Sequence, residues 1–315
     1  MKKTIFAVCF LVLSAINLNT QQDNFPRLIG PYLGQKPPGM TPEIFAPGIV
    51  STEHHEHSAP TFSPDGNEIY WSVFYNKKPP QVILYMKNLN GEWSKPTVAE
   101  FSGKFSDGSP FISPDGKRLF FDSNRPVNKN DTIKNDPDIW MVEKSGSRWG
   151  KPVNLGRKVN SLSFDGSPSV SMNGNLFFLS ERNDSFGKHD IYYSKFDSGD
   201  YIYPVNLGIK INTEDYEDYP FIAKDESYIL FCGSNRKDGF GLGDLYISFK
   251  NSNGDWENPI NLGNKINSKF DDRFPAVSPN NKYLFFVSDR SGNSDIYWVD
   301  AKVIEELKSD MFNSR

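Results

Sequence analysis

A ten-residue segment, DGSPFISPDG at 107–116, recurs with variation and constrains the fold more than any other feature of the chain. Its five copies begin at His57, Asp107, Asp165, Glu217 and Asp272. Their prolines follow one another at intervals of 50 to 58 residues, at Pro60, Pro110, Pro168, Pro220 and Pro275. Self-similarity at such a period means that one supersecondary unit is copied and stacked.

Each period contains four short apolar runs, of which residues 111–156 give a clear example. The first run is FIS and the second is RLFFDS, with the tight turn SPDG between them. The third is DIWMVE, and the fourth follows an aromatic residue, as in WGKPVNLG. Pro, Asp and Gly supply the dihedral angles of a hairpin turn. Four short strands in each period predict the blades of a β-propeller.

The number of runs predicts how the ring closes. Five first, second and third runs are complete, but only four fourth runs follow them. The segment EIFAPGIV at 43–50 supplies the missing one, because FAPGIVST aligns with VNLGRKVNS and INLGNKINS. We therefore expect an all-β chain with a single five-bladed β-propeller of four-stranded blades over 43–300, closed by an N-terminal strand that leaves no unpaired edge. Six blades are the alternative.

The chain ends fall outside the repeats. Residues 1–20 are predicted to be a signal peptide, because Lys2 and Lys3 precede an apolar stretch too short to span a bilayer. Residues 21–42, rich in Pro and Gly, are expected to form an extended arm without regular structure. Residues 301–315 are expected to form a helical tail with one apolar face, made by Val303, Ile304, Leu307 and Met311.

Composition and the leader limit the possible partners. The signal peptide predicts an exported protein, periplasmic or extracellular. Removal of Cys9 with this peptide would leave Cys232 alone, so no internal disulfide is expected. A net charge of −4 and a pI near 5.7 argue against a nucleic-acid partner. The mature chain is expected to be monomeric and not to span a membrane.

The motifs also resemble a known family. The order SPDG, an aromatic pair, S-x-R and then D-I-Y is similar to the PD40 (WD40-like, TolB-like) propeller repeat, and residues 278–298 match it most fully. Blade 1 departs from the pattern, with Tyr75 in place of the Arg and Ile83 in place of the Asp. The resemblance implies a propeller but no single activity.

Four pairs of one Arg and one Asp each bracket the loops between the second and third strands. They are expected to form structural ion pairs. The pairs would be Arg125 with Asp138, Arg182 with Asp190, Arg236 with Asp244, and Arg290 with Asp295.

A ring of polar residues precedes the prolines at the expected channel mouth. The predicted ligand-binding set is His55, His57, Asp107, Asp165, Glu217, Asp272 and Arg273. Acidic groups around an aromatic-lined mouth suit a sugar or a cation. The alternative is structural, with each acid bonded to the backbone of the turn that leads into its strand.

The segment EHHEH at 53–57 holds three of the four histidines. No cofactor is predicted, but His55 and His57 are weak candidates for a divalent metal such as zinc. His57 and Asp165 are the candidates for catalysis, as a base beside a carboxylate. The loop 126–137, with Asp131, Asp136 and the adjoining Asp138, lacks the spacing of a calcium loop. The glycine-rich run 239–243 lies between two strands, so it does not form a phosphate-binding loop.

These observations favour binding over catalysis. We expect a non-enzymatic binding or scaffold module for a glycan, a peptide or an envelope protein. The alternative is a polysaccharide-active lyase or glycosidase with His57 and carboxylates at the channel mouth.

Overall fold

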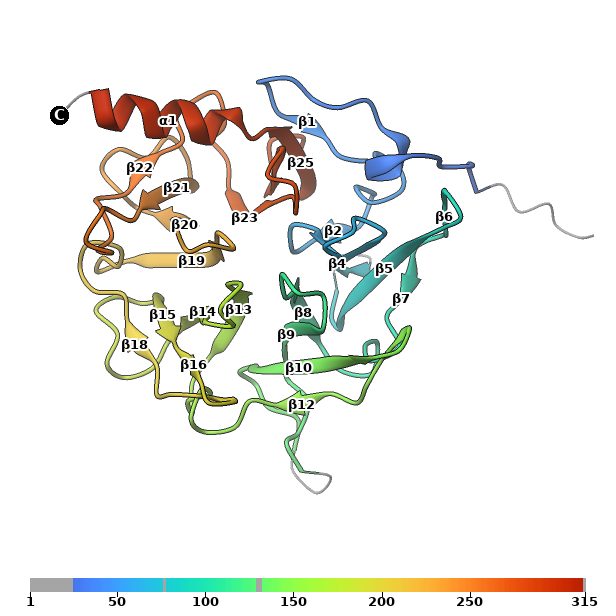
Figure 1. Ribbon diagram of the computed structural model, residues 1–315, viewed down its shortest axis with the longest axis horizontal. Coiled ribbons are helices and arrows are strands. Elements are labelled where there is room, and N and C mark those ends of the chain that lie inside the picture. Colours follow the sequence, from blue (N-terminus) through green and yellow to red (C-terminus); the bar gives the residue numbers. More distant parts are fainter. Residues whose placement is uncertain (1–24, 76–77, 129–131, 314–315) are drawn as a thin grey trace, which may run out of the picture.

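Five β-sheets are arranged around a central axis in the computed structural model, which describes residues 25–75, 78–128 and 132–313 (Figure 1). The predicted five-bladed propeller is confirmed. The predicted signal peptide lies outside the described residues, and so does Asp131.

The first three blades each carry an additional short hairpin. Blade 1 contains β2 (His55–Glu56), β3 (Thr61–Phe62), β4 (Glu68–Phe74), β5 (Gln81–Leu89), β6 (Glu92–Trp93) and β7 (Thr97–Val98). Blade 2 contains β8 (Asp107–Ile112), β9 (Arg118–Ser123), β10 (Asp138–Ser145), β11 (Arg148–Trp149) and β12 (Val153–Asn154). Blade 3 contains β13 (Asp165–Val170), β14 (Leu176–Ser180), β15 (Asp190–Ser194), β16 (Phe196–Asp197), β17 (Asp200–Tyr201) and β18 (Val205–Asn206).

The last two blades have four strands each. Blade 4 contains β19 (Tyr216–Ile222), β20 (Tyr228–Ser234), β21 (Gly243–Phe249) and β22 (Ile260–Asn261). Blade 5 contains β23 (Asp272–Val277), β24 (Tyr283–Ser288), β25 (Asp295–Asp300) and β1 (Glu43–Ile44). The innermost strands β3, β8, β13, β19 and β23 line the channel, and their apolar neighbours pack between blades.

The N-terminal strand closes the ring as predicted. Strand β1 pairs antiparallel with β25, the third strand of blade 5, so blade 5 is built from both ends of the propeller (Figure 1). Phe45 follows β1, is fully buried, and donates its backbone N–H to Ile296 O at 2.8 Å. Its ring meets Phe285 and Trp298 edge to face, which joins this closure to the apolar core.

The described part of the N-terminal arm has more structure than the sequence predicts. A short 3-10 helix, η1 (Pro31–Gly34), buries Leu33 against blades 5 and 1. The indole Nε1 of Trp93 donates to Gly30 O at 2.8 Å. Composition alone predicted an extended arm without regular structure, because this contact joins segments that are distant in sequence.

Helix α1 (Lys302–Asn313) follows the last blade and packs on the outer side of blades 4 and 5 (Figure 1). Val303 and Ile304 are buried, and Leu307 and Met311 pack against the same cluster. In the described part of the chain, no helix has the length and apolar character needed to cross a membrane.

Candidate functional site

The arginines of the loops between second and third strands do form ion pairs, but not with the predicted partners. Each reaches inward to the acid that begins the innermost strand of its own blade. The pairs are Arg125–Asp107 at 2.5 Å, Arg182–Asp165 at 2.8 Å, Arg236–Glu217 at 2.8 Å and Arg290–Asp272 at 2.6 Å.

The aspartates predicted as partners bond within or beside their own loops instead. Asp190 and Asp244 accept backbone N–H groups of the loops before them, at 2.6 Å from Phe186 and 2.7 Å from Phe240. Asp295 accepts from Ser291 Oγ at 2.5 Å. Asp138 accepts from Lys134 and Asn154. These local contacts leave the arginines free to turn toward the innermost strands. The glycine run 239–243 therefore lies in a loop tied to Asp244.

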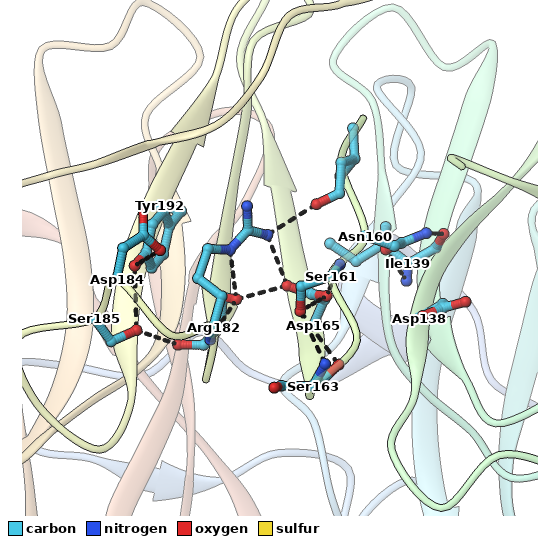
Figure 2. A network of polar contacts seen from close by, with 12 residues as sticks. Asp138, Ile139, Asn160, Ser161, Ser163, Asp165, Arg182, Asp184, Ser185 and Tyr192 are labelled. Carbon is cyan, nitrogen blue, oxygen red and sulfur yellow. Dashed lines mark hydrogen bonds and ion pairs between the residues drawn. The ribbon is translucent and has the colours of Figure 1, made fainter. Parts of the chain in front are cut away.

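Blade 3 shows how one arginine and its neighbours occupy the hydrogen-bonding positions of the buried acid (Figure 2). Arg182 Nη2 donates to Asp165 Oδ1 and to Val159 O, each at 2.8 Å, and Arg182 Nε donates to Ser180 Oγ at 2.9 Å. The second oxygen of Asp165 accepts from Ser161 N at 2.5 Å and Ser161 Oγ at 2.7 Å. The guanidinium also lies over the rings of Phe178 and Tyr192.

The burial of these acids changes the interpretation of the ring of polar residues that was predicted at the channel mouth. The side chains of Asp107, Asp165, Glu217 and Asp272 have no exposed surface. Burial raises the pKa of Glu217, and the Arg236 guanidinium opposes that shift. A carboxylate that is buried and already bonded to arginine is not available to a channel ligand. Each of the four acids is tied into its own blade, and this burial favours the structural alternative over ligand binding.

In blade 1 the equivalent acid is Glu56 and not His57, which corrects a further prediction. Glu56 lies opposite Val73, as Asp165 lies opposite Ser180. It also accepts from the N–H and hydroxyl of Thr52, four residues earlier, at 3.2 and 2.9 Å. The same four-residue spacing joins Thr213 to Glu217. That spacing was visible in the sequence and would have identified Glu56. An additional residue before Pro60 shifted the alignment.

Glu56 has no arginine, because Tyr75 occupies the equivalent position. The Glu56 side chain is fully buried, and within the described part of the chain its Oε2 has no hydrogen-bond partner. Burial raises the pKa of Glu56 to about 8, so the carboxyl is mostly protonated at neutral pH.

His57 lies between aromatic rings near the narrowest part of the channel. Its ring is 5.0 Å from that of Phe74 and 5.0 Å from that of Phe274, and Nδ1 is 3.3 Å from Gln81 Nε2. Burial, followed by the charge of Arg273, lowers the pKa of His57 to about 3. The imidazole is therefore neutral. Asp165, the other catalytic candidate, belongs to a different blade and is bonded to Arg182, so the structure does not assemble the predicted pair.

His55 lies beside His57, with 5.6 Å between the ring centroids. Across the residues that the structure describes, no group of three or more His, Cys, Asp or Glu side chains is placed to hold a metal ion. His55 Nε2 is 3.3 Å from Ser294 Oγ, which joins it to the polar contacts of blade 5.

Blades 4 and 5 place charged residues where blades 2 and 3 have Gly108 and Gly166. Arg273, which was among the predicted ligand-binding residues, is 6% exposed. Its guanidinium donates to Asp271 at 2.7 Å, to Asp289 at 3.1 Å and to Ser294 Oγ at 2.8 Å. Its hydrogen-bonding groups are thus directed at protein partners.

His189 and its two acids form a cluster that the sequence analysis missed. Nδ1 is 2.6 Å from Asp218 Oδ1, and Nε2 is 2.8 Å from Glu181 Oε1. Burial alone lowers the pKa of His189, but the Asp218 hydrogen bond and charge and the Glu181 charge outweigh it, and the net shift is upward. The three residues come from different strands and loops, so no sequence motif marks them.

The channel narrows at the residues before the prolines. Ser109, Ser167, Tyr219 and Phe274 have φ angles of 45°, 50°, 56° and 52°, and each lies where the register of its strand shifts. The rings of Tyr219 and Phe274 approach to 3.7 Å between centroids, and Ser109 Oγ is 3.3 Å from Ser167 Oγ. Left-handed backbone costs about 1 to 3 kcal/mol per residue, so four copies are maintained by the surrounding fold.

A cavity of about 280 Å³ lies on the SPDG-turn side of this narrowing. All five repeat prolines line it, together with apolar side chains that include Phe62, Phe111, Val170 and Phe221. The rings of Phe111 and Phe221, from blades 2 and 4, are 6.2 Å apart. The sequence analysis placed the site at the opposite end of the channel. The prolines themselves were the missed signal, since they lie on the innermost strands.

These features define a five-bladed β-propeller with an apolar cavity on its axis. The chain belongs to the PD40 TolB β-propeller domain family, whose profile matches residues 46–303. No curated protein sequence matches the chain.

Solved structures with similar folds include TolB proteins and an enzyme. Putative TolB from Agrobacterium tumefaciens is 20% identical, with a TM-score of 0.48 over 73% of this chain and 69% of that one. TolB from Acinetobacter baumannii is 17% identical, with a TM-score of 0.48 over 79% of this chain and 55% of that one. An α-L-arabinofuranosidase from Lactobacillus brevis is 10% identical, with a TM-score of 0.51 over 78% of this chain and 90% of that one. At these identities the likeness concerns the fold alone.

Proposed function

We propose that this protein is an exported, non-enzymatic binding module that takes an apolar part of an envelope protein or peptide into the axial cavity. The observation that carries the proposal is the cavity of about 280 Å³ on the SPDG-turn side, lined by prolines and aromatic rings. Its volume is near the lower limit of typical ligand pockets, about 300 to 1,000 Å³. Apolar side chains bind such a lining by leaving water.

The chemistry of the lining favours a peptide over a glycan. A sugar needs several hydrogen-bonding groups, whereas the hydroxyls at the narrowing already have protein contacts. Ser109 Oγ and Ser167 Oγ are 3.3 Å apart, and Thr61 Oγ1 accepts from Ile112 N at 3.0 Å. Asp107 and Asp165, which the enzyme alternative places at the channel mouth, are buried in ion pairs with Arg125 and Arg182.

Filling the cavity tests the proposal. Ala276 lines it and is partly exposed, so Ala276→Phe places a ring in the space. Val153→Phe is the matched control, because Val153 is 51% exposed on the outer strand β12. The purified chain without its predicted signal peptide would be panned against displayed random peptides and against an array of cell-wall glycans. We expect peptides to be selected, and their affinity to be lost with Ala276→Phe but kept with Val153→Phe.

Three results would contradict the proposal. Selected peptides whose affinity is unchanged by Ala276→Phe would place binding outside the cavity. Glycans bound in preference to peptides would assign a different ligand class. Turnover of a polysaccharide that is lost with His57→Ala, while the thermal unfolding midpoint is kept, would favour the enzyme.

A further inference from the structure

The rim of the axial cavity is formed by one residue from each of the five blades, and one of the five differs in chemistry from the others. The second residue of each turn after the innermost strand lines the cavity. In chain order these residues are Pro64, Pro114, Met172, Lys224 and Pro279. Lys224 is the only lining residue that carries a formal charge at neutral pH. The residue at this position is apolar in blades 1, 2, 3 and 5 and cationic in blade 4, so the rim is asymmetric.

The backbone of Lys224 is held by a hydrogen bond to the turn of the neighbouring blade, while its side chain is exposed. Lys224 O accepts the N–H of Met172 at 2.8 Å, which joins the turns of blades 3 and 4. The side chain is exposed, and among the described residues its Nζ forms no hydrogen bond or ion pair.

The two acids next in sequence have other partners. Asp225 accepts from Ser227, and Glu226 accepts from Ser171 Oγ at 2.8 Å and Lys250 Nζ at 3.0 Å. These contacts lower the pKa values of both carboxyls despite their partial burial. Neither acid therefore neutralises Lys224 by direct contact.

The narrowing above the cavity limits what can enter. The rings of Tyr219 and Phe274, which are in contact, come from blades 4 and 5, and the paired hydroxyls of Ser109 and Ser167 come from blades 2 and 3. Both pairs belong to residues that line the cavity. Because these pairs narrow the channel beside the cavity, we expect a ligand to present a chain end or a single side chain and not to thread through the channel.

We infer that the cavity binds the carboxyl terminus of a peptide whose last residue is large and apolar. The terminal side chain would lie in the cavity against the rings of Phe111 and Phe221, which contact each other, and the α-carboxylate would lie at the rim beside Lys224 Nζ. Capture of a chain-terminal carboxylate is an established mode of peptide recognition. This inference rests on the proposed function and specifies its ligand.

Peptides with matched ends test the inference. Fluorescent Gly-Ser peptides ending in Leu, Phe or Trp would be titrated with the protein, each as the free acid and as the C-terminal amide. We expect the free acid to bind about tenfold more tightly, the size of one charge-assisted contact at a partly exposed site. Lys224→Gln should remove this preference. Lys117→Gln should keep it, because Lys117 is exposed on an equivalent turn but does not line the cavity.

The outcomes separate this inference from the proposed function. Equal affinity for acid and amide, with binding still lost in Ala276→Phe, would overturn the carboxylate assignment alone. No binding of any free-acid peptide would also overturn it, while peptides selected from the display library would still test the binding module. Octanoate supplies the same chemistry without a peptide. If it binds more tightly than every peptide and depends on Lys224, the ligand is a free fatty acid and the peptide assignment is wrong.

Discussion

Arg182 Nη2 donates to Asp165 Oδ1 at 2.8 Å inside the wall of the channel, where the arginine side chain is 6% exposed and the aspartate side chain is fully buried. The pair comes from one blade, but Arg182 Nη2 also bonds Val159 O in the segment that leads in from blade 2. The same contact in three other blades makes this pair a repeated element of ring assembly.

We predict that Arg182→Met destabilises the propeller by about 3 to 5 kcal/mol, because removing one member of a buried pair leaves Asp165 charged and unpaired. Urea unfolding followed by fluorescence measures the change. The matched control is Arg27→Met, which breaks the surface pair with Glu92, where the side chains are 72% and 48% exposed. That change should cost less than about 1 kcal/mol. Equal effects of the two variants would mean that burial does not determine the role of the pair.

Glu56 should make stability fall as pH rises. Its pKa is raised from 4.5 to about 8 by burial, so the folded chain retains a proton that the unfolded chain releases between these values. The free energy of unfolding attributable to this group should therefore decrease with a slope of up to about 1.4 kcal/mol per pH unit over that window. Glu56→Gln remains uncharged and should flatten the profile. Parallel profiles for wild type and variant between pH 5 and 8 would contradict the prediction.

The absent arginine of blade 1 can be supplied. Tyr75→Arg combined with Val73→Ser recreates the residues that hold Asp165 in blade 3, so a guanidinium would stabilise ionised Glu56. We expect the pH dependence of unfolding to match that of Glu56→Gln, with stability at pH 8 above wild type. Tyr75→Ala with Val73→Ser is the control, because it removes the same groups without adding a charge. A pH profile for the arginine variant that equals the control would show that the guanidinium does not reach Glu56.

His189 should remain charged above the usual histidine range. Its pKa is raised because the contacts with Asp218 and Glu181 outweigh burial. Burial alone would lower the pKa of His189, whereas the net shift is upward. The protonated imidazole therefore contributes stability to the folded protein that is complete below pH 6.5 and is lost as pH rises through the folded pKa. An NMR titration of the imidazole measures it directly. Asp218→Asn should lower the pKa of His189, and an unchanged titration would contradict the assigned contact.

Removal of the Phe45 side chain should open the ring at its closure. Phe45 is fully buried and contacts the rings of Phe285 and Trp298, so Phe45→Ala should cost about 3 to 5 kcal/mol of unfolding free energy. Leu89→Ala is the control, since Leu89 is 62% exposed on β5. Calorimetry would compare both with wild type. A loss below about 1 kcal/mol for Phe45→Ala would mean that β1 pairing, and not Phe45 packing, maintains closure.

The sequence by itself determined the number of blades and the strand that closes the ring. Turn residues and apolar runs are local, so SPDG at 113–116 predicts a hairpin whatever surrounds it. The missing fourth run and the segment 43–50 could be compared without coordinates. Repetition made each local prediction support the others.

Only the tertiary structure decided which side chains meet. Arg182 has Asp190 nearer in sequence, but its guanidinium donates to Asp165, whereas Asp190 accepts N–H groups of its own loop. Blade 1 has one additional residue before Pro60, so alignment on the proline selected His57 in place of Glu56. The error matters because a shift of one position reverses which face of a strand a side chain occupies. The axial cavity and Lys224 on its rim depend on five turns brought together from across the chain. A one-dimensional pattern does not contain that convergence, since it is created by closing the ring.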